Sequence, residues 1–466
     1  MNTQSMYAER RVKLNEKLDN GIAIFFGNEE TGMNYADNAY PFRQDSTFLY
    51  FSGIDRPGLA LVSDLESGEW TLYGDDLTAD DIVWTGTLPT VREYAEKAGI
   101  KNTAPLSVLK DFVDEARKAE RHVHFLPPYR DEHRRKLCHL GIKSEDGTYS
   151  DASIPLIVTI SELRIKKSEY EIAEIERAVE ISLNMHLAAM TMARPGMTES
   201  QIMARVAEMA YASGGSLSFP IIATINGHVL HNHHYGHTLE PGQLFLLDAG
   251  AETDTHYAGD LSSTFPVDPK FTQKQKDIYD IVLASFLAAV DELKPGANFV
   301  DIHLKAAKII ANGLKDLGLM KGDVDEAVAN GAHALFFPCG LGHLMGLDVH
   351  DMENFGEVHF GYRGQPKSTQ FGLKSLRLGR ELQEGFVLTI EPGIYFMPEL
   401  TDMWKAEGKH KDFINYPALK AYRGFGGIRT EEDFLITDKG CRRLGSPKPR
   451  TTEEIEAVRA AGVPVD

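Results

Sequence analysis

The chain has 466 residues, of which 42% are hydrophobic and 25% are charged, and its formal net charge is −19 at pH 7. This length exceeds what one ordinary hydrophobic core holds, so we expect two domains with the composition of a soluble globular protein. The acidic excess argues against a nucleic-acid surface, and no run of about 18 apolar residues predicts a membrane span. Three scattered cysteines predict no disulfide framework and favour a reducing, cytoplasmic setting.

The first third of the chain mixes short strand-like segments with helical patterns. Runs of β-branched, aromatic and aliphatic residues predict strands at residues 21–27, 48–54, 59–63 and 70–73. Amphipathic periodicity predicts helices at residues 91–98 and 108–119. A polar, basic stretch from Arg164 begins a long helix that continues to about Met192. We place the domain boundary near the start of this stretch. The sequence therefore predicts an N-terminal α/β domain with a mixed sheet over residues 1–165.

The remainder, residues 166–466, carries two internal repeats. With an offset of 143, E-P-G-Q-L-F-L-L-D-A-G, which ends at Gly250, matches Q-E-G-F-V-L-T-I-E-P-G, which ends at Gly393. With an offset of 100, R-P-G-M-T-E-S-Q-I matches K-P-G-A-N-F-V-D-I, and Thr198 and Asn298 are the expected N-caps of the helices that follow. Two matches in the same order predict two related halves, each a helix pair plus an antiparallel sheet, which share one curved sheet.

The repeats place acids at matching ends of two strand-like runs. Asp248 ends the first run and Glu391 ends the second, and a carboxylate at the end of a buried strand is costly unless a positive group pairs with it. Asp260 and Glu431, in neighbouring strand-like segments, give each half a pair of acids. Each acid alone is more often a turn or cap residue, but four converging carboxylates hold protons unless cations neutralise them. With His343 they predict a site for two divalent ions, and such oxygen-rich donors suit Mn²⁺.

Five motifs, in this order, resemble the proline-specific metallopeptidases, the family of Xaa-Pro dipeptidase (prolidase) and aminopeptidase P. They are L-L-D-A-G, Y-A-G-D-L-S-S-T-F-P-V, G-L-G-H-L-M-G-L-D-V-H-D, T-I-E-P-G-I-Y-F and G-G-I-R-T-E-E-D. The N-terminal R-Q-D-S-T-F-L-Y-F-S-G-I resembles the accessory domain of that family. The resemblance implies an accessory α/β domain over residues 1–165 and a pseudo-two-fold "pita-bread" α+β catalytic domain over residues 166–466. It also implies a homodimer or higher homo-oligomer.

The resemblance further implies a role for each candidate site residue. The implied ligands of two metal ions are Asp248, Asp260, His343, Glu391 and Glu431. His231 is implied to approach the substrate amide, and His350 to stabilise the tetrahedral intermediate. Arg429 lies next to the last ligand, and Glu391 also moves a proton. Such a site cleaves the Xaa-Pro bond of small proline-containing peptides.

Three features depart from the family pattern. Cys339 stands where the family usually has a histidine. Eleven residues separate Asp248 from Asp260, one more than is typical, which predicts a longer hairpin turn. In H-N-H-H-Y-G-H, the distance to Asp248 favours His231 as the histidine that faces the substrate, and His234 is the alternative.

The subtype of peptidase depends on one arginine. A dipeptidase must grip the free carboxylate of the terminal proline, and Arg377 lies in a segment that resembles prolidase, although it could also be a surface charge beside Lys374 and Arg380. We therefore predict cleavage of Xaa-Pro bonds with a preference for dipeptides. The alternatives are an aminopeptidase P that acts on longer Xaa-Pro-Yaa peptides and a non-catalytic pita-bread binding protein. The presence of all the implied ligands disfavours a metal-free creatinase, and the motifs disfavour a dinuclear phosphoesterase.

Overall fold

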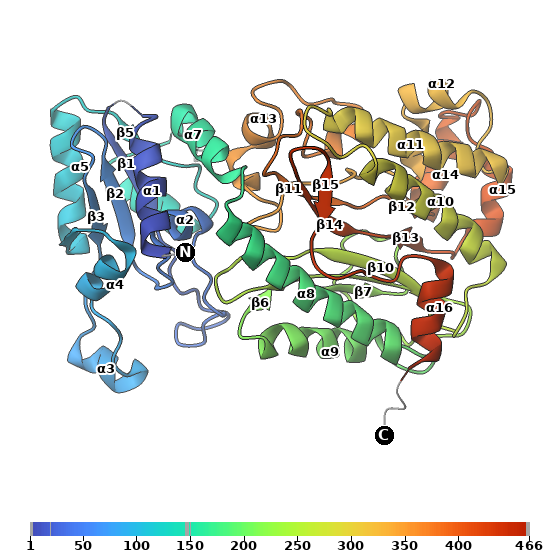
Figure 1. Cartoon of the computed structure of the whole chain (residues 1–466), viewed down its shortest axis with the longest axis horizontal. Helices are drawn as coiled ribbons and strands as arrows, with labels where there is room; N and C mark the ends of the chain where they lie inside the picture. The colour runs from blue at the N-terminus through green and yellow to red at the C-terminus, as the bar shows by residue number, and fades with distance from the viewer. Residues whose placement is uncertain (1–2, 19, 145–148, 150, 463–466) are drawn as a thin grey trace. The chain divides into compact units, whose positions relative to one another are not determined.

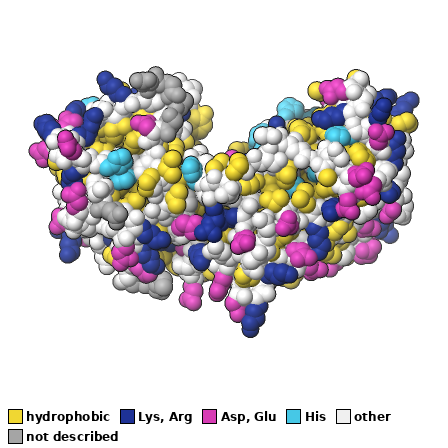
Figure 2. Space-filling model, turned by 90° about the horizontal axis from the view of Figure 1, so that it is seen from above, with side chains coloured by type: hydrophobic (Ala, Val, Ile, Leu, Met, Phe, Trp, Pro, Cys, Tyr) yellow, Lys and Arg dark blue, Asp and Glu magenta, His cyan; other side chains and the backbone are white. Residues whose placement is uncertain are grey.

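The structure is a computed structural model that describes residues 3–18, 20–144, 149 and 151–462. It divides into two compact units, one of Met1–Arg164 with Met352–Phe360 and one of Ile165–Asp351 with Gly361–Asp466. Acidic and basic side chains are interspersed on the face shown in Figure 2. Within the described ranges, no helix combines the length and the apolar composition that crossing a membrane requires.

The first unit is built on a five-stranded mixed sheet with the strand order β4-β3-β2-β1-β5 (Figure 1). Its strands are Ile22–Phe26 (β1), Ala60–Asp64 (β2), Trp70–Tyr73 (β3), Asn102–Ala104 (β4) and Val123–His124 (β5). β1 pairs antiparallel with β2 and parallel with β5, so the sheet is mixed as predicted. The helices are Thr3–Asn15 (α1), Ser46–Ser52 (α2), Ala79–Thr85 (α3), Val91–Ala98 (α4), Leu106–Val108 (η1), Leu109–Lys118 (α5), Asp131–His139 (α6), Ile154–Arg164 (α7), Glu353–Phe355 (η3) and Glu357–Phe360 (α13).

One predicted strand of this unit is instead a helix. The segment expected to be a strand at residues 48–54 forms most of α2. The Asp45 side chain accepts a hydrogen bond from Phe48 N at 2.8 Å and so caps the helix, and Gly53 ends it in the left-handed conformation with a φ of 63°. Every residue of α2 is buried. The aromatic and aliphatic run that predicted a strand therefore reflects burial on all sides of a short helix.

The second unit contains two helix pairs, each followed by antiparallel strands (Figure 1). The first half consists of Glu169–Met192 (α8), Glu199–Ala212 (α9), Ser216–Leu217 (β6), Ile222–Thr224 (β7), Leu244–Ala249 (β8), Ala251–Glu252 (β9) and Leu261–Pro266 (β10). The second half begins with Gln273–Val290 (α10), Phe299–Asp316 (α11), Val324–Ala329 (α12), Ala332–Leu335 (η2) and Leu373–Ser375 (η4). It continues with Val387–Ile390 (β11), Gly393–Tyr395 (β12), Pro398–Glu407 (α14), Tyr416–Leu419 (α15), Lys420–Tyr422 (η5), Gly427–Arg429 (β13), Glu432–Ile436 (β14), Cys441–Arg443 (β15) and Thr452–Ala460 (α16).

These strands form several small sheets, not the one curved sheet that we predicted. Two three-stranded sheets have the orders β10-β8-β7 and β11-β14-β15, and β12-β13 and β6-β9 are two-stranded. Pro392 separates β11 from β12, and because proline has no N–H donor it interrupts the ladder there. The halves meet where Glu431 N donates to Ser262 O at 3.1 Å.

The Pro-Gly repeat has the same backbone pairing in both halves. Thr198 forms an isolated bridge with Thr238 in the first half, and Asn298 forms one with Glu381 in the second. The two partners are displaced by 100 and 143 residues, which are the two offsets of the sequence repeats. The side chains of Thr198 and Asn298 both accept a backbone N–H of the helix that follows, which confirms the predicted caps. The duplication seen in the sequence is therefore also a duplication of local structure.

Candidate metal centre and active site

A cavity of about 240 Å³ in the second unit is lined by every predicted site residue. Those residues are His231, Asp248, Asp260, His343, His350, Arg377, Glu391, Arg429 and Glu431. An apolar part of the wall is formed by Phe219, Pro220, Ile222, Leu230 and Val349. Residues far apart in the chain, from both halves of the duplication, thus line one cavity.

The acids stand at or next to strand ends, as the repeats predicted. Asp248 is the penultimate residue of β8, and Glu391 directly follows β11. Asp260 directly precedes β10, and Glu431 directly precedes β14. His343 comes from a loop that pairs with β11, because Thr389 N donates to His343 O at 3.0 Å.

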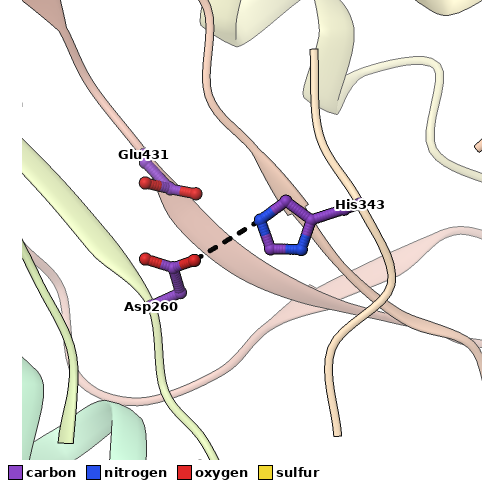
Figure 3. Close-up of side chains that lie close together, drawn as sticks. All are labelled: Asp260, His343 and Glu431. Carbon is purple, nitrogen blue, oxygen red and sulfur yellow. Dashed lines mark ion pairs between the residues drawn. The ribbon is translucent and has the colours of Figure 1, made fainter. Parts of the chain in front are cut away.

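Asp260, His343 and Glu431 form the tightest cluster of donor groups in this cavity (Figure 3). One ligand atom of each lies within 4.8 Å of the others, and His343 Nε2 is 3.4 Å from Asp260 Oδ2 and 3.7 Å from Glu391 Oε1. His343 Nδ1 lies 3.1 Å from Leu344 O, so the neutral imidazole donates there and turns the lone pair of Nε2 toward the acids. Asp260 Oδ1 is buried and has no hydrogen-bond partner among the residues that the structure describes. The donor set therefore fits a divalent cation.

Burial keeps these acids from ionising as ordinary carboxyls do. It raises the pKa of Asp260 well above the usual range, and the charge on Asp248 adds to this rise. It also raises the pKa of Glu431 well above its usual range, with Asp260 and Glu391 as further causes. For Glu391, burial raises the pKa to about 8. A cation bound among them would compensate the charge that burial disfavours.

Arg429, in the cavity wall, connects the acids of the two halves. Its guanidinium donates to Asp248 Oδ2 at 2.5 Å, to Ser262 Oγ at 2.9 Å and to the Tyr395 hydroxyl at 2.9 Å. Ser262 Oγ in turn donates to Glu431 Oε2 at 2.8 Å. Neither Ser262 nor Tyr395 was predicted from the sequence. The sequence could have predicted Ser262, because residues two apart in a strand share a face and Ser262 follows Asp260 by two residues.

The histidine-rich loop places two of its rings at the cavity. His231 and His233 line it, whereas the ring of His234, the alternative considered above, contacts His237 with 5.2 Å between centroids. Burial lowers the pKa of His231. His350 lies edge-on to the ring of His343, with 4.3 Å between their centroids.

Cys339 is a neutral member of the cavity wall. Its Sγ lies 3.9 Å from the Tyr395 hydroxyl, and burial raises the pKa of the thiol to about 12. A protonated thiol is a poor metal ligand, because the thiolate is the form that binds metals. Cys339 therefore borders the donor cluster without adding a soft ligand to it.

The duplicated fold and its buried cluster of acids and one histidine define a metalloenzyme. Residues 173–438 match the model of metallopeptidase family M24, and residues 7–124 match the model of the aminopeptidase P N-terminal domain. The chain belongs to metallopeptidase family M24. This confirms the family predicted from the motifs.

Curated relatives and solved structures cover nearly the whole chain. The Xaa-Pro dipeptidase of Homo sapiens is 33% identical over 98% of this chain and 93% of its own length. The Xaa-Pro aminopeptidase of Escherichia coli is 34% identical over 98% of this chain and 97% of its own length. The structure of Escherichia coli aminopeptidase P with the inhibitor Pro-Leu superimposes with a TM-score of 0.81 at 30% identity, and an aminopeptidase of Pseudomonas aeruginosa with 0.81 at 28%, each covering 98% of both chains. The predicted fold class, an α/β domain followed by a pita-bread catalytic domain, is confirmed.

Proposed function

We propose that this enzyme hydrolyses the Xaa-Pro bond of small proline-containing peptides, with a preference for Xaa-Pro dipeptides. The observation that carries the proposal is the convergence of every predicted site residue on one cavity. The similarity to both a dipeptidase and an aminopeptidase supports the bond that is cleaved. We assign residues 166–466 to the catalytic domain and residues 1–165 to the accessory domain.

Two divalent ions, with Mn²⁺ as the favoured metal, are the proposed cofactors. Their ligands are Asp248, Asp260, His343, Glu391 and Glu431. Four carboxylates and one imidazole suit such ions, and the protonated Cys339 adds no thiolate that would select a softer metal. When bound, two such ions lower the pKa of a water molecule and polarise a carbonyl group.

Different side chains around the cavity carry out the proton transfer, the stabilisation of the carbonyl oxygen and the positioning of the acids. Glu391 takes a proton from the attacking water and returns it to the proline nitrogen, which needs a proton to leave. His231 and His350, which line the cavity with it, donate hydrogen bonds to the oxygen of the scissile carbonyl as negative charge develops there. Arg429 holds Asp248 directly and Glu431 through Ser262, so it keeps the acids of both halves in place.

The preference for dipeptides rests on Arg377. Arg377 lines the cavity, and a guanidinium there offers a fork of N–H donors that can bind the terminal carboxylate of an Xaa-Pro dipeptide. Acting on longer Xaa-Pro-Yaa peptides is the second candidate function, supported by the similarity to the Escherichia coli aminopeptidase over almost the full length of both chains.

The test compares Xaa-Pro and Xaa-Pro-Yaa peptides with added Mn²⁺ for the wild type, Arg377→Ala and Lys374→Ala. Lys374 is an exposed neighbour in the same basic run and does not line the cavity, so it is the control. We expect the Arg377 variant to lose dipeptide turnover selectively. Unchanged dipeptide turnover would refute the dipeptidase preference, and no turnover of either peptide by the wild type would refute the proposed function.

A homodimer or a higher homo-oligomer in the cytoplasm is the proposed state of the enzyme. Helix α3 supports self-association, because its Val83 and Trp84 are 76% and 86% exposed. Adjacent large apolar side chains at the surface are typical of an interaction site. The acidic net charge of −19 argues against nucleic acid as a partner. Light scattering that finds only monomers would contradict the oligomer.

A further inference from the structure

The carboxylate of Glu199, the first residue of helix α9, is fully buried at 0% exposure and accepts four hydrogen bonds. Thr224 Oγ1 and Ile225 N donate to Oε1, each at 3.0 Å. His237 N donates to Oε2 at 3.0 Å, and His237 Nδ1 lies 2.9 Å from the same oxygen. A buried carboxylate with donors on both oxygens is compensated by hydrogen bonds alone and needs no cation.

Those four donors lie at the two ends of one loop, residues 225–237, with Thr224 as the last residue of β7 directly before it. The loop leaves strand β7, where Ile222 pairs with Asp248, and it carries His231 and His233 to the cavity wall. Asn232, in its middle, donates to Thr224 Oγ1 at 3.0 Å. One carboxylate therefore contacts both ends of the histidine loop.

The second half of the duplicated domain shows which part of this contact belongs to the fold. Glu199 N donates to His237 O at 3.0 Å, and at the equivalent position Phe299 N donates to Arg380 O at 3.3 Å. The backbone contact is thus common to both halves. Only the first half, however, has a carboxylate there, because Phe299 is a buried apolar side chain. The four hydrogen bonds to the Glu199 carboxylate, which we call the Glu199 clamp, therefore occur only in the half that carries the histidine loop.

We propose that Glu199 is a positioning residue that holds loop 225–237 so that His231 faces the substrate. The proposal rests on the proposed role of His231 in Xaa-Pro hydrolysis. A loop released at both ends samples other orientations. Ordering it so that His231 contacts the transition state then costs conformational entropy. The loss falls on kcat more than on KM, because the hydrogen bond from His231 to the carbonyl oxygen strengthens in the transition state.

Glu199→Gln tests the clamp with almost no change of shape. Glutamine keeps one acceptor oxygen but replaces the other by an NH₂ group, which then faces either the two His237 donors or the pair from Thr224 and Ile225. Whichever way the amide turns, one backbone N–H, that of His237 or that of Ile225, loses its acceptor, whereas Thr224 Oγ1 and His237 Nδ1 can themselves accept from the NH₂ group. The matched control is Glu171→Gln, since Glu171 is also buried in the first turn of a helix but accepts from Ser168 N at 2.9 Å in α8.

Two measurements are made on the Mn²⁺-loaded full chain. Hydrogen exchange read by mass spectrometry follows the amides of residues 225–237, and steady-state kinetics on an Xaa-Pro dipeptide gives kcat and KM. For Glu199→Gln we expect faster exchange in this loop and a kcat lower by about 10- to 100-fold, with KM changed by less than about threefold. Glu171→Gln should leave both the exchange of the loop and kcat unchanged.

A double variant separates positioning from general destabilisation. If Glu199 acts through His231, adding Glu199→Gln to His231→Ala lowers kcat little further. Independent, multiplicative losses, or wild-type kcat in Glu199→Gln, would overturn the proposal. An inactive wild type would refute the proposed function instead, and loop exchange would still report whether the clamp exists. Should Glu199→Gln not fold, Thr224→Val removes one donor to Glu199 and is judged by the same outcomes.

Discussion

The first half of the catalytic unit contributes Asp248, Asp260 and the histidine loop to the cavity, whereas the second contributes His343, Glu391 and Glu431. The acids are arranged differently in the two ladders. In the first half Asp248 lies opposite Ser262 within the ladder, whereas in the second the ladder ends where Ile390 lies opposite Glu432, so Glu391 and Glu431 lie just outside it. A duplicated backbone has thus kept the acids at its strand ends while the groups around them diverged.

This difference shows how one half completes the other. Glu431 of the second half bridges with Ser262 of the first half, and the hydroxyl of that serine donates to the Glu431 carboxylate. The connection between Asp248 and Asp260, predicted to be longer than usual, contains strand β9, which pairs with β6. The halves are therefore similar in backbone and unequal in chemistry, and the site requires both.

The largest expected effect comes from removing one acid of each half. Asp260→Asn and Glu431→Gln should each lower kcat/KM by more than the roughly 10- to 100-fold that the loss of an outer partner of a metal site costs. Both variants should also retain less metal, which elemental analysis measures. Asp438→Asn, at an exposed acid of the second half, is the control. If one variant keeps wild-type activity and metal content, that half does not contribute to a shared centre.

The contact between the halves can be tested at two adjacent serines. Ser262→Ala removes a partner of both Arg429 and Glu431, so we expect metal affinity to fall by about 10- to 100-fold. Ser263, whose Oγ lies 2.9 Å from His186 Nδ1 and does not touch these residues, is the control. Ser263→Ala should lower stability while metal affinity in a competitive titration stays unchanged. Equal metal affinities of the two variants would contradict the bridging role of Ser262.

The sequence predicted the parts of the site that repeat and missed those that depend on packing. Asp248 and Glu391 were found because the same frame of glycines and apolar residues surrounds both. Glu199 lies in the Pro-Gly repeat, but its counterpart there is Phe299, and Ser262 has no repeat frame, so each matters only through partners elsewhere in the chain. Helix α2 was taken for a strand for a related reason, because its burial on all sides hides the helical period.

Buried histidines differ between the halves and give the next prediction. In the first half, His186 bonds Ser263 Oγ and Ala249 O, whereas in the second no described residue is a hydrogen-bond partner of either ring nitrogen of His303. His186→Phe should therefore cost about 1–3 kcal/mol of unfolding free energy, because it leaves buried groups unpaired. His303→Phe should be neutral or stabilising, since His303 already stacks on Phe337 with 5.2 Å between centroids.

The same variants predict a dependence on pH. Burial lowers the pKa of both His186 and His303 to about 3, whereas an unfolded histidine has a pKa of about 6.5. As the pH falls from about 6.5 toward 3, the unfolded chain binds protons that the folded chain does not, so the free energy of unfolding decreases. His303→Phe should lose less stability than the wild type between pH 7 and pH 4.5 in thermal unfolding. If the stability of both proteins falls equally with pH, His303 does not take up a proton on unfolding.

The smallest expected effect tests the likeness of the halves. Thr198→Ala and Asn298→Ala remove equivalent helix caps, and each should cost about 1 kcal/mol. Thr198 also belongs to a reciprocal capping box, because Gln201 Oε1 accepts from Thr198 N at 2.9 Å, so its loss should be slightly the larger. Chemical denaturation and the exchange of amides in the first turns of α9 and α11 measure both. If only Thr198→Ala destabilises, the capping interactions, like the side chains around the acids, have diverged between the two halves.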